Sequence, residues 1–142
     1  VYNNAVYVCG GYNHNGVTQA TCERLQLSAD GTPTGTWQMI TSLPMPIMQS
    51  CMFTLNNKVR TIELPFARSP LRVLRQKKTL QLYHIGGYAG NLTSYAQVYT
   101  YEDNTRQWTP APSLPIPLFN HACTVFNAKA LLCGGRSTVR SA

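Results

Sequence analysis

Acidic residues are scarce in this chain of 142 residues, which has five Asp and Glu against twelve Lys and Arg. A net charge of +7 would ordinarily suggest nucleic acid or an anionic membrane as a partner. Six of the twelve cations, however, lie with a single acid in residues 60–78, so the basicity belongs to one segment. We therefore expect neither a nucleic-acid nor a membrane partner.

Long apolar runs and paired cysteine motifs are also missing. No apolar run approaches the roughly 18 residues that a membrane helix needs. The chain begins Val1-Tyr2-Asn3 without a leader sequence, and we interpret it as a fragment with a cytoplasmic location. Its five cysteines form no Cys-x-x-Cys pair, which predicts buried free thiols in a reducing compartment and neither a metal site nor a cofactor.

What the chain does contain is an internal repeat. Trp37 aligns with Trp108, and residues 42–49 align with residues 113–120, at an offset of 71. Three apolar runs end in a glycine pair, namely Gly10-Gly11, Gly86-Gly87 and Gly134-Gly135. The second and third pairs are 48 residues apart and the first and second are 76 apart, so residues have been added between the first two.

Each repeat unit has the pattern of four short strands separated by turn signals. In the second unit the expected strands are 82–85, 97–101, 107–109 and 120–126, and helix signals are absent. The glycine pair is expected to end the first of these strands. Because it lacks side chains, it could let a bulky ring approach the backbone, and Trp37 and Trp108 are the expected rings.

One ordered set of motifs carries a family resemblance. A strand ending in Gly-Gly is followed by Tyr101 and Trp108, then by Leu-Pro-x-Pro, and then by an apolar strand with an Asn-x-Lys turn. This order resembles the kelch repeat, whose four-stranded blades build a β-propeller. The resemblance covers nearly all of the chain except residues 59–81, although Leu27 stands in the first unit where Tyr101 stands in the second.

The resemblance implies an all-β fold, an incomplete β-propeller of about two four-stranded antiparallel blades. Residues 1–58 would hold the first unit and the start of the next blade, and residues 82–142 the second unit and the start of a third. A closed ring needs about four to eight blades, so we expect part of a longer protein that is marginally stable alone.

Residues 59–81 interrupt the repeat. Deleting them joins Lys58 to Leu82 and restores the repeat without a gap. Val59-Arg60 and Gln81 can be encoded by the two ends of an unspliced intron, which favours a retained intron; the alternative is a genuine long hairpin loop. Either is expected to be disordered or poorly packed. A basic amphipathic helix within this stretch is a further, less favoured reading.

Loops after each glycine pair and after each Leu-Pro are expected to line one face. The candidate partner-binding residues are Tyr12, His14, Met48, Gln49, Tyr88, Asn91, Phe119, Asn120 and His121. The structural residues of the repeat are Gly10, Gly11, Trp37, Gly86, Gly87, Tyr101, Trp108, Gly134 and Gly135. No catalytic residue is assigned, because the three histidines are scattered; His84 is expected in the core, and His14 and His121 in loops.

The resemblance implies a protein-interaction module. It could be the substrate-recognition part of a ubiquitin-ligase adaptor or a cytoskeletal, actin-binding scaffold. Family members that recruit acidic peptides commonly carry an Arg after the second Pro, where this chain has Ile47 and Leu118, so a more apolar contact surface is expected. The alternative is a fragment of a kelch-propeller enzyme acting on carbohydrate, either an oxidase or a sialic-acid mutarotase.

Overall fold

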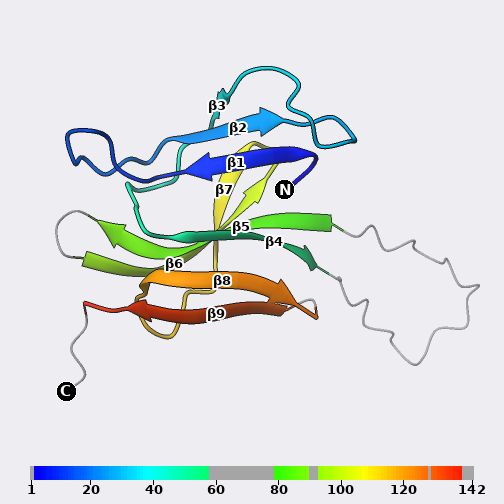
Figure 1. The fold of residues 1–142 in the computed structure, drawn as a ribbon. Coiled ribbons are helices and arrows are strands. Elements are labelled where there is room, and N and C mark those ends of the chain that lie inside the picture. Colours follow the sequence, from blue (N-terminus) through cyan, green and yellow to red (C-terminus); the bar gives the residue numbers. More distant parts are fainter. Residues whose placement is uncertain (1, 58–78, 90–92, 128, 139–142) are drawn as a thin grey trace, which may run out of the picture.

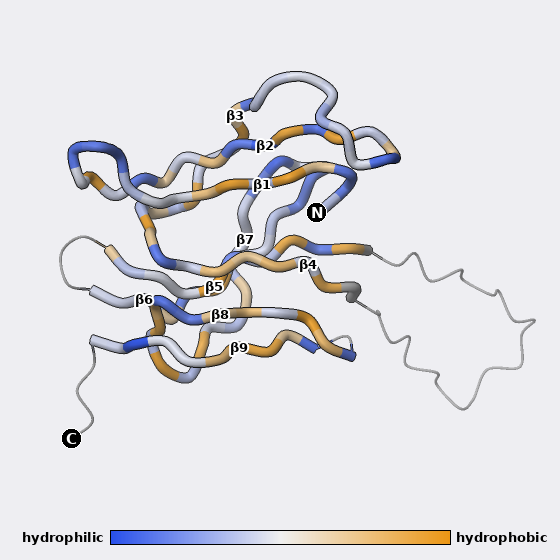
Figure 2. Tube along the Cα trace, viewed as in Figure 1, coloured by the Kyte–Doolittle hydropathy of each residue, from blue (hydrophilic) through white to orange (hydrophobic). Residues whose placement is uncertain are grey.

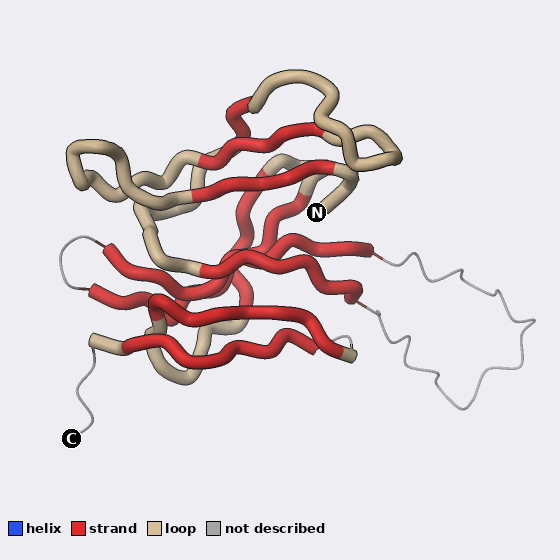
Figure 3. Tube along the Cα trace, viewed as in Figure 1, coloured by secondary structure: helices blue, strands red, loops and turns tan. Residues whose placement is uncertain are grey.

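Within the parts of the chain that the computed structural model describes, residues 2–57, 79–89, 93–127 and 129–138, the fold is all-β (Figures 1 and 3). Its strands form three antiparallel sheets. The first sheet has the order β1 (Ala5–Cys9), β2 (Cys22–Gln26), β3 (Gln38–Ile40). The second has the order β4 (Cys51–Asn57), β5 (Thr79–Ala89), β6 (Thr93–Glu102), β7 (Gln107–Ala111), and the third pairs β8 (Phe119–Phe126) with β9 (Lys129–Arg136).

The strands form where the sequence is rich in aromatic and β-branched residues. In β6 the side chains of Val98, Tyr99 and Tyr101 are buried, and a turn at residues 103–106 follows the strand. Hydrophilic residues gather in the turns and apolar residues along the strands (Figure 2). Each strand predicted in the second unit lies within an observed strand. No described residue forms a helix, so no membrane-crossing helix occurs among them.

The two repeat units make equivalent backbone hydrogen bonds. In each unit the bonds join the glycine pair and the residues at or near the start of the second strand to the Leu-Pro segment, at the spacings of the sequence repeat. Gly11 N–H donates to Ile47 O in the first unit, and Gly87 N–H donates to Leu118 O in the second, both at 2.8 Å. Leu43 N–H donates to Ala20 O as Leu114 N–H does to Ala96 O, both at 2.8 Å. Ile47 N–H donates to Gln19 O at 3.0 Å, and Leu118 N–H donates to Tyr95 O at 3.1 Å. The sequence repeat is therefore a structural repeat.

The segments that approach the glycines differ from those predicted. A side chain on Gly10 would meet the carbonyl oxygen of Ile47, and one on Gly86 would lie 2.5 Å from the carbonyl oxygen of Leu118. The prediction that a tryptophan ring fills this space is wrong. The Leu-Pro segment that follows each sheet takes the space instead, and only glycine leaves room for its backbone.

The glycine pair ends a strand in one unit but not in the other. β1 ends at Cys9, whereas β5 continues through Gly86-Gly87 to Ala89, with a register shift between Ile85 and Gly87. Both glycines have positive φ, of 57° and 117°. In the second unit the pair does not end the strand but lies at an irregularity of the register, where Gly86 is opposite two residues of β6, Ala96 and Gln97.

The register also corrects the alignment of the first unit. Val6 pairs with Leu25 just as Leu82 pairs with Tyr101. Leu25 therefore stands at the position of Tyr101. Leu27, to which the sequence assigned that position, lies in the following loop and forms an isolated bridge with Pro33.

The hairpin of β4 with β5 and the hairpin of β8 with β9 are paired in the same register. Leu55 pairs with Gln81 at the place where Phe126 pairs with Lys129. Residues 79–81, predicted to belong to a disordered or loop segment, are part of β5. The remaining residues of that segment, 59–78, lie outside the described residues.

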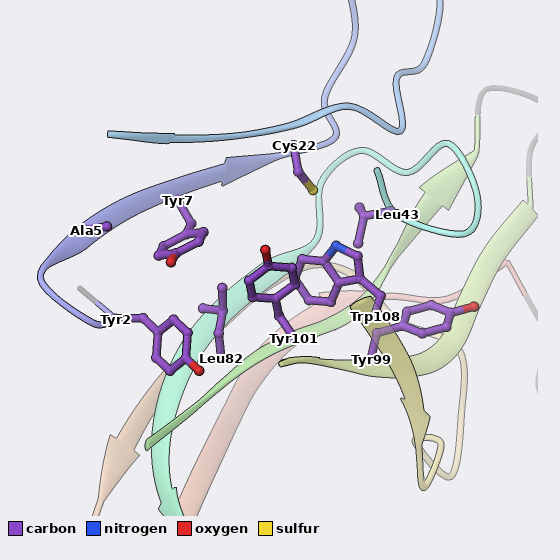
Figure 4. Close-up of a cluster of buried hydrophobic side chains, with 9 residues drawn as sticks. All are labelled: Tyr2, Ala5, Tyr7, Cys22, Leu43, Leu82, Tyr99, Tyr101 and Trp108. Atoms are coloured by element: carbon purple, nitrogen blue, oxygen red, sulfur yellow. The ribbon is translucent and has the colours of Figure 1, made fainter. Parts of the chain in front are cut away.

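The main core lies between the first and second sheets (Figure 4). Side chains from both sheets and from the segment after β3 contribute to it, namely Tyr2, Ala5, Tyr7, Cys22, Leu43, Leu82, Tyr99, Tyr101 and Trp108. Trp108 is 8% exposed and its Nε1–H donates to the carbonyl oxygen of Thr41 at 3.0 Å. Trp37, its counterpart, is 45% exposed, so the two rings have different surroundings.

Four of the five cysteines form disulfides. Cys9 and Cys22 are directly paired across β1 and β2, and Cys51 is bonded to Cys123, which ties β4 to β8. Cys133 is free but exposed. The prediction of buried free thiols is wrong, and the cytoplasmic location loses the support that those thiols gave it.

Candidate functional site

Three segments that are distant in sequence meet where β5 ends and β8 begins. Met48 and Tyr88 exchange backbone hydrogen bonds of 2.9 Å in both directions. The backbone N–H of Asn120 donates to the carbonyl oxygen of Gln49 at 3.0 Å. The structure therefore brings together five of the predicted partner-binding residues, which with the nearby Tyr12 we call the loop face: Tyr12, Met48, Gln49, Tyr88, Phe119 and Asn120.

Aromatic side chains give the loop face its chemical character. The rings of Tyr88 and Phe119 are 4.9 Å apart between centroids and tilted by 37°, and both side chains are partly exposed. Tyr12, which follows the first glycine pair, is 67% exposed. Arg136 is paired with Phe119 across β8 and β9 and supplies a positive charge at the edge. The surface is apolar with a cationic border.

The backbone of the loop face is unusual at two equivalent positions. Gln49 has a φ of 56° and Asn120 has a φ of 54°, and both side chains are exposed. Left-handed conformations are uncommon for residues other than glycine, and asparagine tolerates them best. The repeat thus turns two polar side chains outward beside the aromatic pair.

His14 lies in an ordered turn next to the loop face. The side-chain oxygen of Asn13 accepts hydrogen bonds from the backbone N–H groups of Asn15 and Val17, both at 3.0 Å. This local turn holds His14 exposed to solvent. Asn91 lies outside the described residues, between the end of β5 at Ala89 and the start of β6 at Thr93.

His121 is not a loop residue. It lies in β8, is 7% exposed, and its Cε1 would be 3.1 Å from a side chain on Gly86. Burial lowers its pKa below the ordinary value. The prediction that it contacts a partner directly is therefore wrong, because β8 starts at Phe119, two residues before it.

His84 is in the core, as predicted. It is fully buried, its Nε2 is 2.8 Å from the hydroxyl of Ser50, and its ring meets Trp108 edge-on with 6.2 Å between centroids. Burial, followed by the nearby His121, lowers its pKa to about 4. The histidine is therefore neutral near neutral pH. Its Nδ1 has no partner among the described residues.

The two positions at which the expected arginine is absent differ in burial, since Ile47 is buried and Leu118 is half-buried. Ile47 is fully buried and its carbonyl oxygen is held by Gly11. Because this side chain faces the interior, it cannot contact a partner. The apolar side chains expected to form a contact surface, Tyr12, Met48, Tyr88 and Phe119, are partly or fully exposed in the loop face.

A cleft that was not predicted opens between the first two sheets. Its volume is about 250 Å³, and its walls include Arg24, Gln38, Ile40, Thr41, Tyr101 and Arg106. Elsewhere in the described ranges, no three His, Cys, Asp or Glu side chains gather closely enough to hold a metal ion. The cleft could not be predicted from the sequence, because its two arginines belong to different repeat units and are separated by some eighty residues of chain.

Comparison with known proteins adds no further identification. No family model matches the chain, and none of the curated proteins is similar enough to count as a match.

Proposed function

We propose that this chain is part of a kelch-type β-propeller and that its loop face binds a protein partner. The observation that carries the proposal is the meeting of Met48, Tyr88 and Phe119, partly exposed residues from three separate segments. Rigid strands hold these side chains from beneath, and loops supported in this way are common binding surfaces. The propeller part of the proposal is supported by the equivalent backbone hydrogen bonds of the two units.

The expected partner is a peptide segment with an apolar or aromatic anchor. Aromatic side chains provide large contact area at low conformational cost and dominate many interfaces. The exposed amides of Gln49 and Asn120 could fix the direction of a bound backbone by hydrogen bonding. An adaptor or scaffold role for the parent protein follows from the family resemblance alone.

The proposal can be tested by selecting peptides that bind the chain and then comparing two variants. Phe119→Ser removes half of the aromatic pair, and Phe126→Ser is the control, since Phe126 is 63% exposed at the other end of β8. We expect Phe119→Ser to weaken binding by about tenfold or more and Phe126→Ser to leave it unchanged. Equal affinity of both variants would contradict the proposal, and turnover of a carbohydrate would favour the enzyme alternative.

A further inference from the structure

We propose that the cleft between the first and second sheets binds a small oxyanion, either a phosphate or a carboxylate. Two arginines line it, Arg24 from β2 and Arg106 from the turn after β6. Arginine keeps its charge at any physiological pH, and its planar fork matches two oxygens of a carboxylate or phosphate. A cleft of about 250 Å³ is large enough to admit such an ion.

The existing partner of Arg24 leaves most of its donors free. Arg24 Nη1 is 3.7 Å from Asp103 Oδ1, which is longer than the roughly 2.7–2.9 Å of a close charged hydrogen bond. The other carboxylate oxygen of Asp103 accepts from the Asn3 side-chain amide at 3.0 Å. The Arg24 side chain also interacts with the hydroxyl of Tyr7. The Asp103 carboxylate therefore balances one of the two arginine charges, and it does not fill the hydrogen-bonding capacity of either guanidinium group.

A second observation is a buried hydroxyl beside Arg24. Tyr7 is directly opposite Arg24 across β1 and β2, and its side chain is 9% exposed. The Tyr7 hydroxyl is buried and interacts with the Arg24 side chain. Burial, followed by the nearby charge of Asp103, raises the pKa of Tyr7 to about 12, so the hydroxyl keeps its proton and can donate it.

The cleft is independent of the loop face. Arg106 follows the end of β6, whereas the loop face lies near the start of that strand. Arg24 and Gln38 come from the first unit, and Tyr101 and Arg106 from the second. A bound oxyanion would therefore join two neighbouring units, and failure of the peptide-binding proposal would leave this one intact.

The test is a titration of the full chain with inorganic phosphate, and separately with acetate, at constant ionic strength. Nuclear magnetic resonance reports on the Arg24 and Arg106 side chains and on the Trp108 indole, which donates to Thr41 in the cleft wall. We expect saturable shifts. Arg24→Gln and Arg106→Gln should each weaken binding about tenfold, and Arg24→Lys less than that.

Arg136→Gln is the matched control, because Arg136 is an exposed arginine on the third sheet. It should bind the ion as the unchanged protein does. Saturation with one ion only identifies the ligand as a phosphate or as a carboxylate and supports the site. Absence of saturation with both ions, or equal weakening by Arg136→Gln, overturns it. Arg106 lies in an exposed turn, so Arg106→Gln keeps the test valid if Arg24→Gln fails to fold.

Discussion

The first and second repeat units have the same strand frame but different burial. In the second sheet, Leu82, Tyr101 and Trp108 lie side by side and are buried against the first sheet. Their counterparts in the first sheet include Trp37, which is exposed, and no described element covers that face (Figure 1). The motif therefore determines the strands, whereas a neighbouring sheet determines whether its tryptophan is buried.

On the other face of each sheet, a disulfide in the first unit corresponds to an apolar pair in the second. Cys9 and Cys22 form a disulfide at the paired position that Ile85 and Val98 occupy in the second sheet. Both apolar residues of the second pair are buried. A covalent link in one unit thus replaces an apolar contact in the next.

The largest expected effect separates the two tryptophans. Trp108→Ala should lower the free energy of unfolding by about 3–5 kcal/mol, because it empties a packed site and leaves the Thr41 carbonyl without its donor. Trp37→Ala should lower it by less than about 1 kcal/mol. Urea denaturation of both variants measures the difference, and equal losses would contradict the distinction between the units.

The two disulfides provide the next comparison. Cys9→Val with Cys22→Val gives the first unit an apolar pair like that of the second, but opens a link across 13 residues at a cost of about 3 kcal/mol. Cys51→Val with Cys123→Val opens a link across 72 residues and should cost about 1.5 kcal/mol more. Denaturation of both double variants under oxidising conditions checks the order, and the reverse order would be inconsistent with the chain-entropy explanation.

The pH dependence of stability should sharpen the same comparison. His84 is buried, whereas its counterpart Val8 is 53% exposed. Because the folded pKa of His84, about 4, lies below its ordinary 6.5, the unfolded chain binds more protons between these values. Stability should therefore fall as the pH drops, by about 2 kcal/mol from about pH 7 to about pH 5.

His84→Gln should flatten this dependence, while His14→Gln, at an exposed position, should leave it in place. Denaturation at a series of pH values distinguishes the two variants. An unchanged slope in His84→Gln would show that another group, such as the buried His121, governs the acid response.

The last comparison concerns two equivalent glycines. A side chain on Gly87 would lie 3.0 Å from the carbonyl oxygen of Met48 and would also meet the Ile47 side chain, whereas one on Gly11 would meet nothing within 4 Å. Both have positive φ, so both alanine variants are strained. Gly87→Ala should cost about 1–3 kcal/mol more than Gly11→Ala in thermal unfolding. A larger cost for Gly11→Ala would reverse this assignment.

These comparisons also show what could be predicted from the sequence. The strands and the repeat were predictable, because alternating apolar residues and a constant spacing are local signals. The partner of the glycine pair was not, because Ile47 and Leu118 reach it from the end of each unit. The disulfides were missed for the same reason, since cysteine spacing alone does not determine the pairing.

The candidate site was predicted in part. The meeting of Met48, Tyr88 and Phe119 followed from placing equivalent loops at one end of the sheets. His121 was expected in a loop. It lies instead in β8, which already begins at Phe119, and its side chain is buried. The cleft with Arg24 and Arg106 depends on the packing of two units against each other, which no single segment encodes.

Tryptophan fluorescence tests most directly whether successive units pack face to face. Trp37→Phe leaves Trp108 as the sole indole, and Trp108→Phe leaves Trp37. The packing described above predicts blue-shifted emission and little quenching by acrylamide in the first variant, and red-shifted, readily quenched emission in the second. Equal accessibility of the two indoles would contradict it.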